Sequence, residues 1–371
     1  MRLNDIKTQI LVPVIAIVLW IACQPVTGQE NDSIGRHRSR YRFGALPIMG
    51  YAPETRIFGG LTGFVMLVGD SSNNNSTIYF SGMISQNKQY TVNMLPDIWL
   101  EENNYHLTGE LKWQYWPDKF FGLGNRTQDS LVEGYTSKIK GVKLDFYRQI
   151  VPGFYTGPLI EIEHNDIIEF DDAAHAVLPA GDIPGSKNSL ITGAGLGLAW
   201  DTRNSIIYPT KGSYHQFRVV YFRNSYQAGA SYLKTILDLR KYITVGNGHL
   251  LRFQGYAKFQ FGSDIPFRNL SLLGGSNLMR GYYSGRYRDN HIIALQAEYH
   301  TPWLWRFSGV LFTGFSDVFG PYSDNDFKDV KPSAGIGLRF AILPDQKLNL
   351  RIDAGLGKGD RGLYFNVMEA F

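Results

Sequence analysis

Five residues that could take part in chemistry lie together in one loop of this sequence. Gly274 and Gly275 come first, and Arg280, Gly281 and Tyr282 follow. Glycine permits sharp turns and a close approach to neighbouring backbone because it has no side chain. An arginine beside such turns is typical of a buried ion pair, in which the planar guanidinium binds a carboxylate through two hydrogen bonds. The chemistry that we expect of Arg280 is therefore to hold the loop in place.

Two other patterns could indicate a metal site or a hydrolase. The segment 164–189 contains donor groups for a divalent cation, but their spacing matches no compact metal-binding loop. These residues are His164, Asp166, Asp171, Asp172 and His175. Ser316 follows Gly314 and Phe315 but lacks the second glycine of the Gly-x-Ser-x-Gly elbow of hydrolases. We therefore expect a solvated loop at 164–189, no metal, no cofactor and no enzyme activity.

The segments around the arginine-containing loop alternate between apolar and polar residues. In 251–261 the apolar set is Leu251, Phe253, Gly255, Ala257, Phe259 and Phe261, and the polar set between them is Arg252, Gln254, Tyr256, Lys258 and Gln260. In 293–300 the polar face includes Glu298, and in 347–354 it includes Asp353. This period of two predicts strands with one apolar and one polar face. A soluble sandwich would bury these charges at a high cost. In a membrane barrel the apolar face meets lipid and the polar face lines a wet lumen.

The composition agrees with a barrel. The chain has 371 residues, 40 glycines, 14% aromatic residues and a formal net charge of +4. Its slightly negative mean hydropathy argues against a helical membrane protein, and its nearly balanced charge leaves no basic stripe for nucleic acid. We predict an all-β fold, a transmembrane antiparallel β-barrel of about sixteen strands. The predicted strands are 42–51, 55–68, 75–86, 89–100, 104–116, 133–150, 153–166, 190–201, 212–223, 230–242, 248–261, 290–300, 304–317, 332–343, 347–357 and 362–371.

The N-terminus resembles a secretion signal. The apolar run 10–23 follows Arg2 and Lys7 and is too short to cross a bilayer. It predicts a signal peptide at 1–28, with an uncleaved anchor helix and a lipoprotein cleavage before Cys23 as the alternatives. Cys23 is the only cysteine and would leave with the signal peptide, so no disulfide is expected.

The rest of the chain reads as one domain. Residues 29–41 form a short, polar and basic segment that we place in the periplasm, and 42–371 form the barrel. The last predicted strand carries Phe365 and ends at the aromatic residue Phe371. A final strand of this form is typical of the sorting signal for outer-membrane assembly, so we expect Phe365 and Phe371 to serve as that signal.

Three motifs occur in the order in which a known family carries them. The segment 43–55 looks like a first barrel strand, and 195–212 contains a mid-barrel Asp-Thr-Arg and Pro-x-x-Gly pattern. The segment 274–282 matches the loop-six motif and falls between the eleventh and twelfth predicted strands. From about Phe43 to Phe371 the chain therefore resembles the outer-membrane assembly-factor superfamily of BamA, TamA and the bacterial surface antigens.

This resemblance implies how the loop is held. Loop six of the family folds into the lumen, and its arginine, here Arg280, pairs with an acidic residue of the wall. Glu298 faces the lumen by alternation, and Asp317 is the second candidate. Family members usually carry POTRA domains before the barrel, and the segment 29–41 leaves no room for one, so we expect a member without them.

The resemblance also implies a function. A monomeric barrel in the outer membrane of a diderm bacterium would assist the insertion of outer-membrane proteins or the translocation of protein or lipid. Its expected partners are outer-membrane lipid, nascent outer-membrane proteins or a periplasmic accessory protein, and no nucleic acid. The alternative is a passive channel or structural barrel with loop six as a plug.

Overall fold

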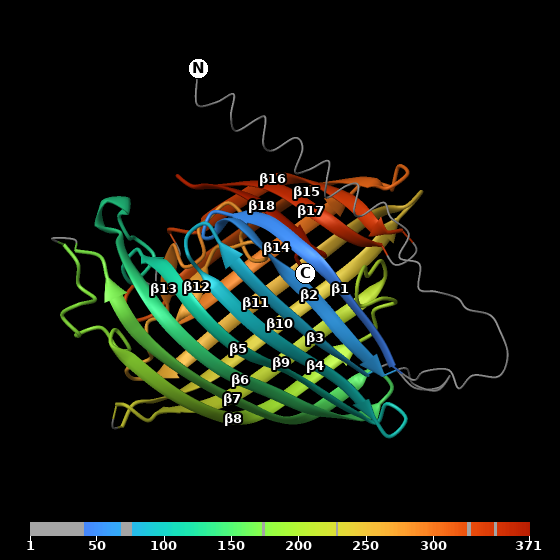
Figure 1. The fold of residues 1–371 in the computed structure, drawn as a ribbon. Coiled ribbons are helices and arrows are strands. Elements are labelled where there is room, and N and C mark those ends of the chain that lie inside the picture. The colour runs from blue at the N-terminus through green and yellow to red at the C-terminus, as the bar shows by residue number, and fades with distance from the viewer. Residues whose placement is uncertain (1–40, 68–75, 173–174, 228, 325–327, 345–346) are drawn as a thin grey trace, which may run out of the picture.

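The computed structural model describes residues 41–67, 76–172, 175–227, 229–324, 328–344 and 347–371. Sixteen antiparallel strands form one closed barrel, in which β1 meets β18 (Figure 1). The strands are β1 (Tyr41–Ala52), β2 (Arg56–Leu67), β3 (Ser76–Ser85), β4 (Tyr90–Leu100), β5 (Tyr105–Phe120), β6 (Glu133–Val151), β7 (Phe154–Phe170), β8 (Asn188–Asp201), β9 (Gly212–Asn224), β10 (Ser231–Val245), β11 (His249–Gly262), β14 (His291–His300), β15 (Phe307–Phe319), β16 (Lys331–Leu343), β17 (Leu348–Gly357) and β18 (Arg361–Val367). No helix among the described residues is long and apolar enough to cross a membrane. The all-β barrel expected from the sequence is confirmed.

The predicted N-terminal segments cannot be compared with this structure. The predicted signal peptide at 1–28 lies outside the described residues, and so does 29–41 apart from Tyr41, which begins β1.

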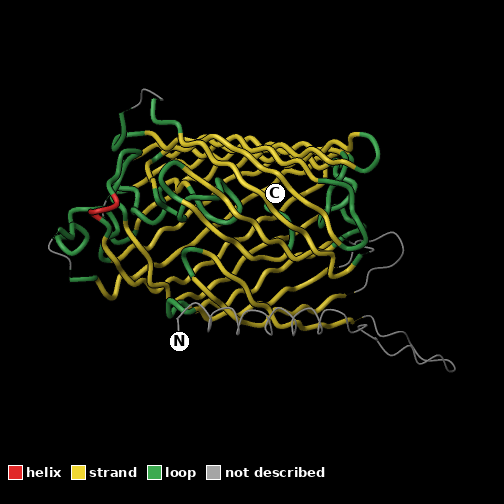
Figure 2. Tube along the Cα trace, turned by 90° about the horizontal axis from the view of Figure 1, so that it is seen from above, coloured by secondary structure: helices red, strands yellow, loops and turns green. Residues whose placement is uncertain are grey.

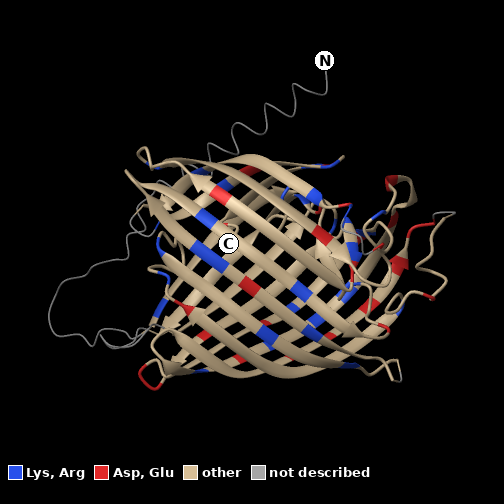
Figure 3. Ribbon diagram, turned by 180° about the vertical axis from the view of Figure 1, so that it is seen from behind, with Lys and Arg blue, Asp and Glu red and all other residues tan. Residues whose placement is uncertain are grey.

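Apolar side chains face out of the barrel and charged side chains face in. On β11, Phe253 and Phe261 are exposed, whereas Arg252 and Gln260 are buried. Figure 3 shows acidic and basic positions along many strands of the wall. Charged residues on the strands can be buried in this way because the interior supplies partners of opposite sign. The period-two pattern of the sequence therefore describes the two faces of the wall correctly.

Loop six, residues 263–290 between β11 and β14, contains regular structure and contacts the barrel wall. Its two arms pair as a small hairpin of β12 (Ser271–Leu273) and β13 (Tyr287–Asp289). Its contacts reach several sides of the wall: the Tyr282 hydroxyl donates to the Pro332 carbonyl at 2.7 Å, and Arg288 donates to the Lys119 carbonyl on β5 at 3.4 Å. Figure 2 shows loops lying within the outline of the strands.

The ends of three strands, β5, β7 and β18, differ from the expectation by four residues each, and β5 runs to Phe120. β7 continues to Phe170, so His164 and Asp166 lie on a strand and the loop begins only at residue 171. β18 ends at Val367, because Met368 adopts a φ of 68° and turns the chain away from the strand. The prediction that the last strand runs to Phe371 is therefore wrong.

Candidate functional site

The tip of loop six is held by a buried ion pair. Arg280 is 1% exposed; its Nη1 donates to Asp353 Oδ2 on β17 at 2.6 Å, and its Nη2 bonds Glu298 on β14. The guanidinium carbon lies 3.7 Å from the centre of the Phe312 ring. A buried charge is tolerated where it is paired and hydrogen-bonded in this way. The geometry ties the loop to two strands that β15 and β16 separate.

Gly281 lets the loop backbone touch the wall. Its φ is 116°, and a Cβ atom there would lie 2.6 Å from the Leu356 carbonyl carbon. Its N–H donates to the Tyr364 hydroxyl on β18 at 3.0 Å. A larger residue would clash with the Leu356 backbone and would have to adopt an unfavourable backbone conformation. Glycine is therefore required for this contact.

Gly274, Gly275 and Tyr282 shape the two arms of the tip. Gly274 and Gly275 have φ values of 108° and 113°, and the Gly275 N–H donates to the Tyr282 carbonyl at 3.0 Å. The Tyr282 hydroxyl donates to the Pro332 carbonyl and accepts the Lys358 N–H, both at 2.7 Å. The structure therefore brings all five residues of the sequence motif into one arrangement.

The ion pair continues into a network that runs along the inside of the wall. Asp353 Oδ1 accepts from Arg339 Nη1 at 2.6 Å, and Arg339 Nε donates to Glu369 Oε2 at 2.8 Å. On the other branch, His300 Nε2 lies 2.9 Å from Glu298 Oε2. Glu369 belongs to the residues that follow β18, so the network connects the loop tip with the end of the seam strand.

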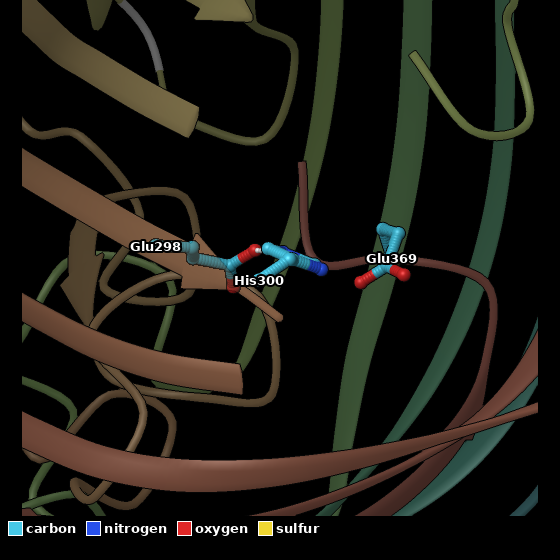
Figure 4. A group of neighbouring side chains, drawn as sticks. All are labelled: Glu298, His300 and Glu369. Atoms are coloured by element: carbon cyan, nitrogen blue, oxygen red, sulfur yellow. Dashed lines mark hydrogen bonds and ion pairs between the residues drawn. The ribbon is translucent and has the colours of Figure 1, made fainter. Parts of the chain in front are cut away.

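Glu298, His300 and Glu369 form the one group of three potential metal ligands within the described part of the chain. Their donor atoms lie within 4.8 Å of one another, and His300 lies between the two carboxylates (Figure 4). Both carboxylates already face arginines, Arg280 and Arg339. Burial opposes ionisation of Glu369, but the nearby Arg339 guanidinium lowers the pKa of this carboxyl to about 2. The surrounding positive charge disfavours a cation, so we describe the group as an ion-pair network.

The acidic residue Asp317 does not lie beside Arg280. In the β14–β15 register it pairs with Ile293, five residues away from Glu298 along β14. That separation is about 17 Å along a strand. Asp317 Oδ2 instead accepts from Asn125 Nδ2 at 3.4 Å. The second acidic partner of Arg280 in this structure is Asp353. The prediction that Asp317 is a partner of Arg280 is therefore wrong.

Among the polar residues of 164–189, His164 and Asp166 form an ion pair, with His164 Nε2 at 3.4 Å from Asp166 Oδ1. His164 Nε2 lies 3.1 Å from the Tyr226 hydroxyl, and His175 Nε2 lies 3.1 Å from the Val132 carbonyl. His164 and His175 therefore have separate partners, and the polar residues of this segment form no group of three potential metal ligands among the described residues.

Sequence reasoning missed Asp353, Arg339 and Glu369. Alternation had placed Asp353 on the polar face, so a search of every lumen-facing acidic residue would have included it. Arg339 could have been found from its place in a predicted strand. Nothing in the sequence indicated that Glu369 lies near the loop tip, because the predicted last strand, 362–371, included this residue.

The seam between β1 and β18 is the weakest junction of the wall. β18 pairs with β1 at one position, Tyr51 with Phe365. In contrast, β1 pairs with β2 along its whole length, and β18 pairs with β17 along its whole length. At the seam, a Cβ atom on Gly50 would lie 2.4 Å from the Phe365 carbonyl oxygen. The two edge strands therefore share little backbone hydrogen bonding, and they meet closely at a glycine.

The two aromatic residues of the expected sorting signal lie in different settings. Phe365 is on β18 at the seam, whereas Phe371 lies beyond the strand and is 6% exposed. A role of Phe365 and Phe371 in sorting stays a prediction.

Comparison with known families agrees with this barrel. A model described as the Omp85 superfamily domain matches residues 73–365. The chain belongs to the Omp85 superfamily. The resemblance seen in the sequence is thereby confirmed, and with it the assignment as a transmembrane β-barrel of the outer membrane. Sequence comparison with curated proteins gives no match.

Solved structures share the fold of this Omp85 barrel. It is similar to BamA from Haemophilus ducreyi lacking POTRA domains 1–3, with a TM-score of 0.60 and 13% identity over 90% of this chain and 71% of that chain. It is also similar to CdiB from Acinetobacter baumannii, with a TM-score of 0.56 and 13% identity over 89% of this chain and 60% of that chain. CdiB from Escherichia coli gives a TM-score of 0.51 and 13% identity over 90% of this chain and 63% of that chain. The chain therefore spans less than two thirds of either CdiB chain, and these likenesses show the fold.

Proposed function

We propose that this Omp85 barrel assists the insertion of outer-membrane proteins, or the translocation of protein or lipid, by opening between β1 and β18. The observation that supports the proposal is the single residue pair, Tyr51 with Phe365, that joins these strands. Unpaired backbone groups on a strand edge are a template for pairing with another chain. A seam of this kind can expose such an edge without unfolding the rest of the wall.

The buried ion pair of loop six keeps the wall next to the seam in place while the seam opens. Arg280 holds the loop to Glu298 on β14 and to Asp353 on β17, so the wall beside the seam stays attached to the loop. In this proposal the barrel acts as a monomer in the outer membrane of a diderm bacterium. Its partners are outer-membrane lipid and nascent outer-membrane proteins, with a periplasmic accessory protein for delivery.

The alternative is a passive channel with loop six as a plug. The observation that favours it is a cavity of about 390 Å³ inside the barrel, lined by ionic side chains such as Lys112, Glu163 and Lys258. Ion conductance through the purified barrel that rises steeply in Arg280→Ala would support this alternative.

Quantitative outer-membrane proteomics tests the proposal. Cells that lack the protein and cells with Arg280→Ala should both show lower amounts of other outer-membrane barrels than wild-type cells. Arg223→Ala, a change of an exposed arginine on β9, is the matched control and should leave the proteome unchanged. An unaltered proteome in the deletion strain would refute the role in protein insertion.

A further inference from the structure

Two adjacent backbone N–H groups of loop six bond to the two turns that flank the seam. The Tyr283 N–H donates to Asp360 Oδ2 at 3.0 Å, and the Ser284 N–H donates to Glu54 Oε1 at 2.6 Å. Asp360 lies in the turn between β17 and β18, and Glu54 lies in the turn between β1 and β2. The loop backbone therefore bridges the seam through one carboxylate on each side.

The bridge lies beside the one backbone pair of the seam. Tyr51 is the residue before the end of β1, and Glu54 follows it in the turn. The rest of β1 is paired with β2 alone among the described residues. Hydrogen bonds from N–H groups to carboxylates are stronger than those between neutral groups. Two such bonds are thus a substantial part of what joins β1 to β18 at this end of the barrel.

The bridging residues are themselves held firmly. The Tyr364 hydroxyl on β18 accepts the Gly281 N–H at 3.0 Å and donates to the Tyr282 carbonyl at 3.1 Å. The Tyr283 hydroxyl donates to Asp118 Oδ1 on β5 at 3.1 Å. Arg280 with its two acidic partners lies just before this stretch. The donors to Glu54 and Asp360 therefore have a fixed position relative to the wall.

We propose that the Tyr283–Ser284 backbone is a clasp across the seam, and that Glu54 and Asp360 are positioning residues that determine how often β1 and β18 separate. This inference deepens the proposed function, since it names what regulates the opening, but its central measurement is independent of any transport activity. Loss of either carboxylate acceptor leaves a loop N–H without its partner and frees one turn from the loop.

Disulfide formation across the seam tests the clasp. Tyr51→Cys with Phe365→Cys places two cysteines opposite each other in an antiparallel pair, where Cα atoms are close enough for a disulfide. Cys23→Ser removes the native cysteine from every variant. In purified, folded barrel, Glu54→Ala with Asp360→Ala should lower the rate of this crosslink several-fold. The Glu54→Gln and Asp360→Asn pair keeps an acceptor oxygen on each side chain and should restore most of the rate.

A second cysteine pair reports whether the barrel remains folded. Leu46→Cys with Thr62→Cys joins β1 to β2 away from the seam, and its crosslink should not change in any background. An unchanged seam crosslink in the double alanine variant would overturn the clasp. If both crosslinks fall in the double alanine variant, the seam crosslink is measured in Glu54→Ala alone. This single change keeps the hydrogen bonds from Asn87 and Gln89 to the Glu54 carbonyl, so a lower seam crosslink in it supports the clasp and an unchanged one overturns it. A weaker seam with a normal outer-membrane proteome would support the clasp while arguing against the role in protein insertion.

Discussion

Arg280 Nη1 on loop six donates to Asp353 Oδ2 on β17 at 2.6 Å, although 73 positions separate the two residues in the chain. The other oxygen of Asp353 accepts from Arg339 on β16 at 2.6 Å. One carboxylate therefore fastens the loop tip to the wall and also joins two wall strands. β17 is the neighbour of the seam strand β18, so this contact holds the loop next to the place where the barrel closes.

Removal of Asp353 should destabilise the barrel strongly. Asp353→Ala leaves Arg280 and Arg339 buried with one carboxylate fewer, and breaking a buried ion pair in this way costs about 3–5 kcal/mol. Arg280→Ala should have a similar effect. The double variant should be less destabilised than the sum of the two by about 1–3 kcal/mol, because both changes remove one interaction. Urea unfolding of the barrel in liposomes measures these free energies.

Protease sensitivity separates a released loop from a merely weaker barrel. Arg218→Ala breaks the buried pair with Asp145 in another part of the wall. It should lower stability without exposing loop six, whereas Arg280→Ala and Asp353→Ala should make loop six a cleavage site. Equal cleavage in all three variants would contradict a specific role of the Arg280–Asp353 contact.

Gly281→Ala should displace the loop tip from β17. The new methyl group would meet the Leu356 backbone at 2.6 Å, and a φ of 116° is unfavourable for alanine. The expected cost is about 1–3 kcal/mol for the backbone conformation alone, plus the contact with the wall. Gly359→Ala is the matched control, since Gly359 also has a positive φ but a Cβ atom there meets nothing within 4 Å. Thermal unfolding should show a clearly larger loss for Gly281→Ala, and equal losses would speak against the close approach.

Glu369 should make the stability of the barrel sensitive to acid. Burial opposes its ionisation, but the Arg339 and Arg252 guanidinium groups lower its pKa from 4.5 to about 2. A carboxyl with a lowered pKa in the folded state stabilises the protein above the unfolded pKa and loses that effect as the pH falls. The wild-type barrel should therefore lose stability between pH 4.5 and about 2. Glu369→Gln should be less stable at neutral pH and should lack this part of the pH dependence, as urea unfolding across this range can determine.

Much of the fold follows from the order of the amino acids alone. The alternation in 251–261 and 293–300 predicts strands with a polar inner face, because side chains on a strand point to opposite sides in turn. Glu298 was placed in the lumen by this argument, and it lies buried beside Arg280. The glycines around Arg280 indicated a tight loop tip for the same local reason: the φ values required there are open to glycine.

The contacts between distant strands depend on the closed barrel. Asp353 was on the predicted polar face, but the stagger of strands around the barrel decides which lumen-facing residue meets the loop tip. Asp317 was a plausible partner by sequence, and the register of β14 with β15 puts it too far along the wall. Glu54 and Asp360 are 306 positions apart in the chain. They accept hydrogen bonds from adjacent N–H groups only because β1 and β18 are neighbours in the closed barrel. Local periodicity can specify the face of a residue, whereas its partner across the lumen is set by closure, register and the path of loop six.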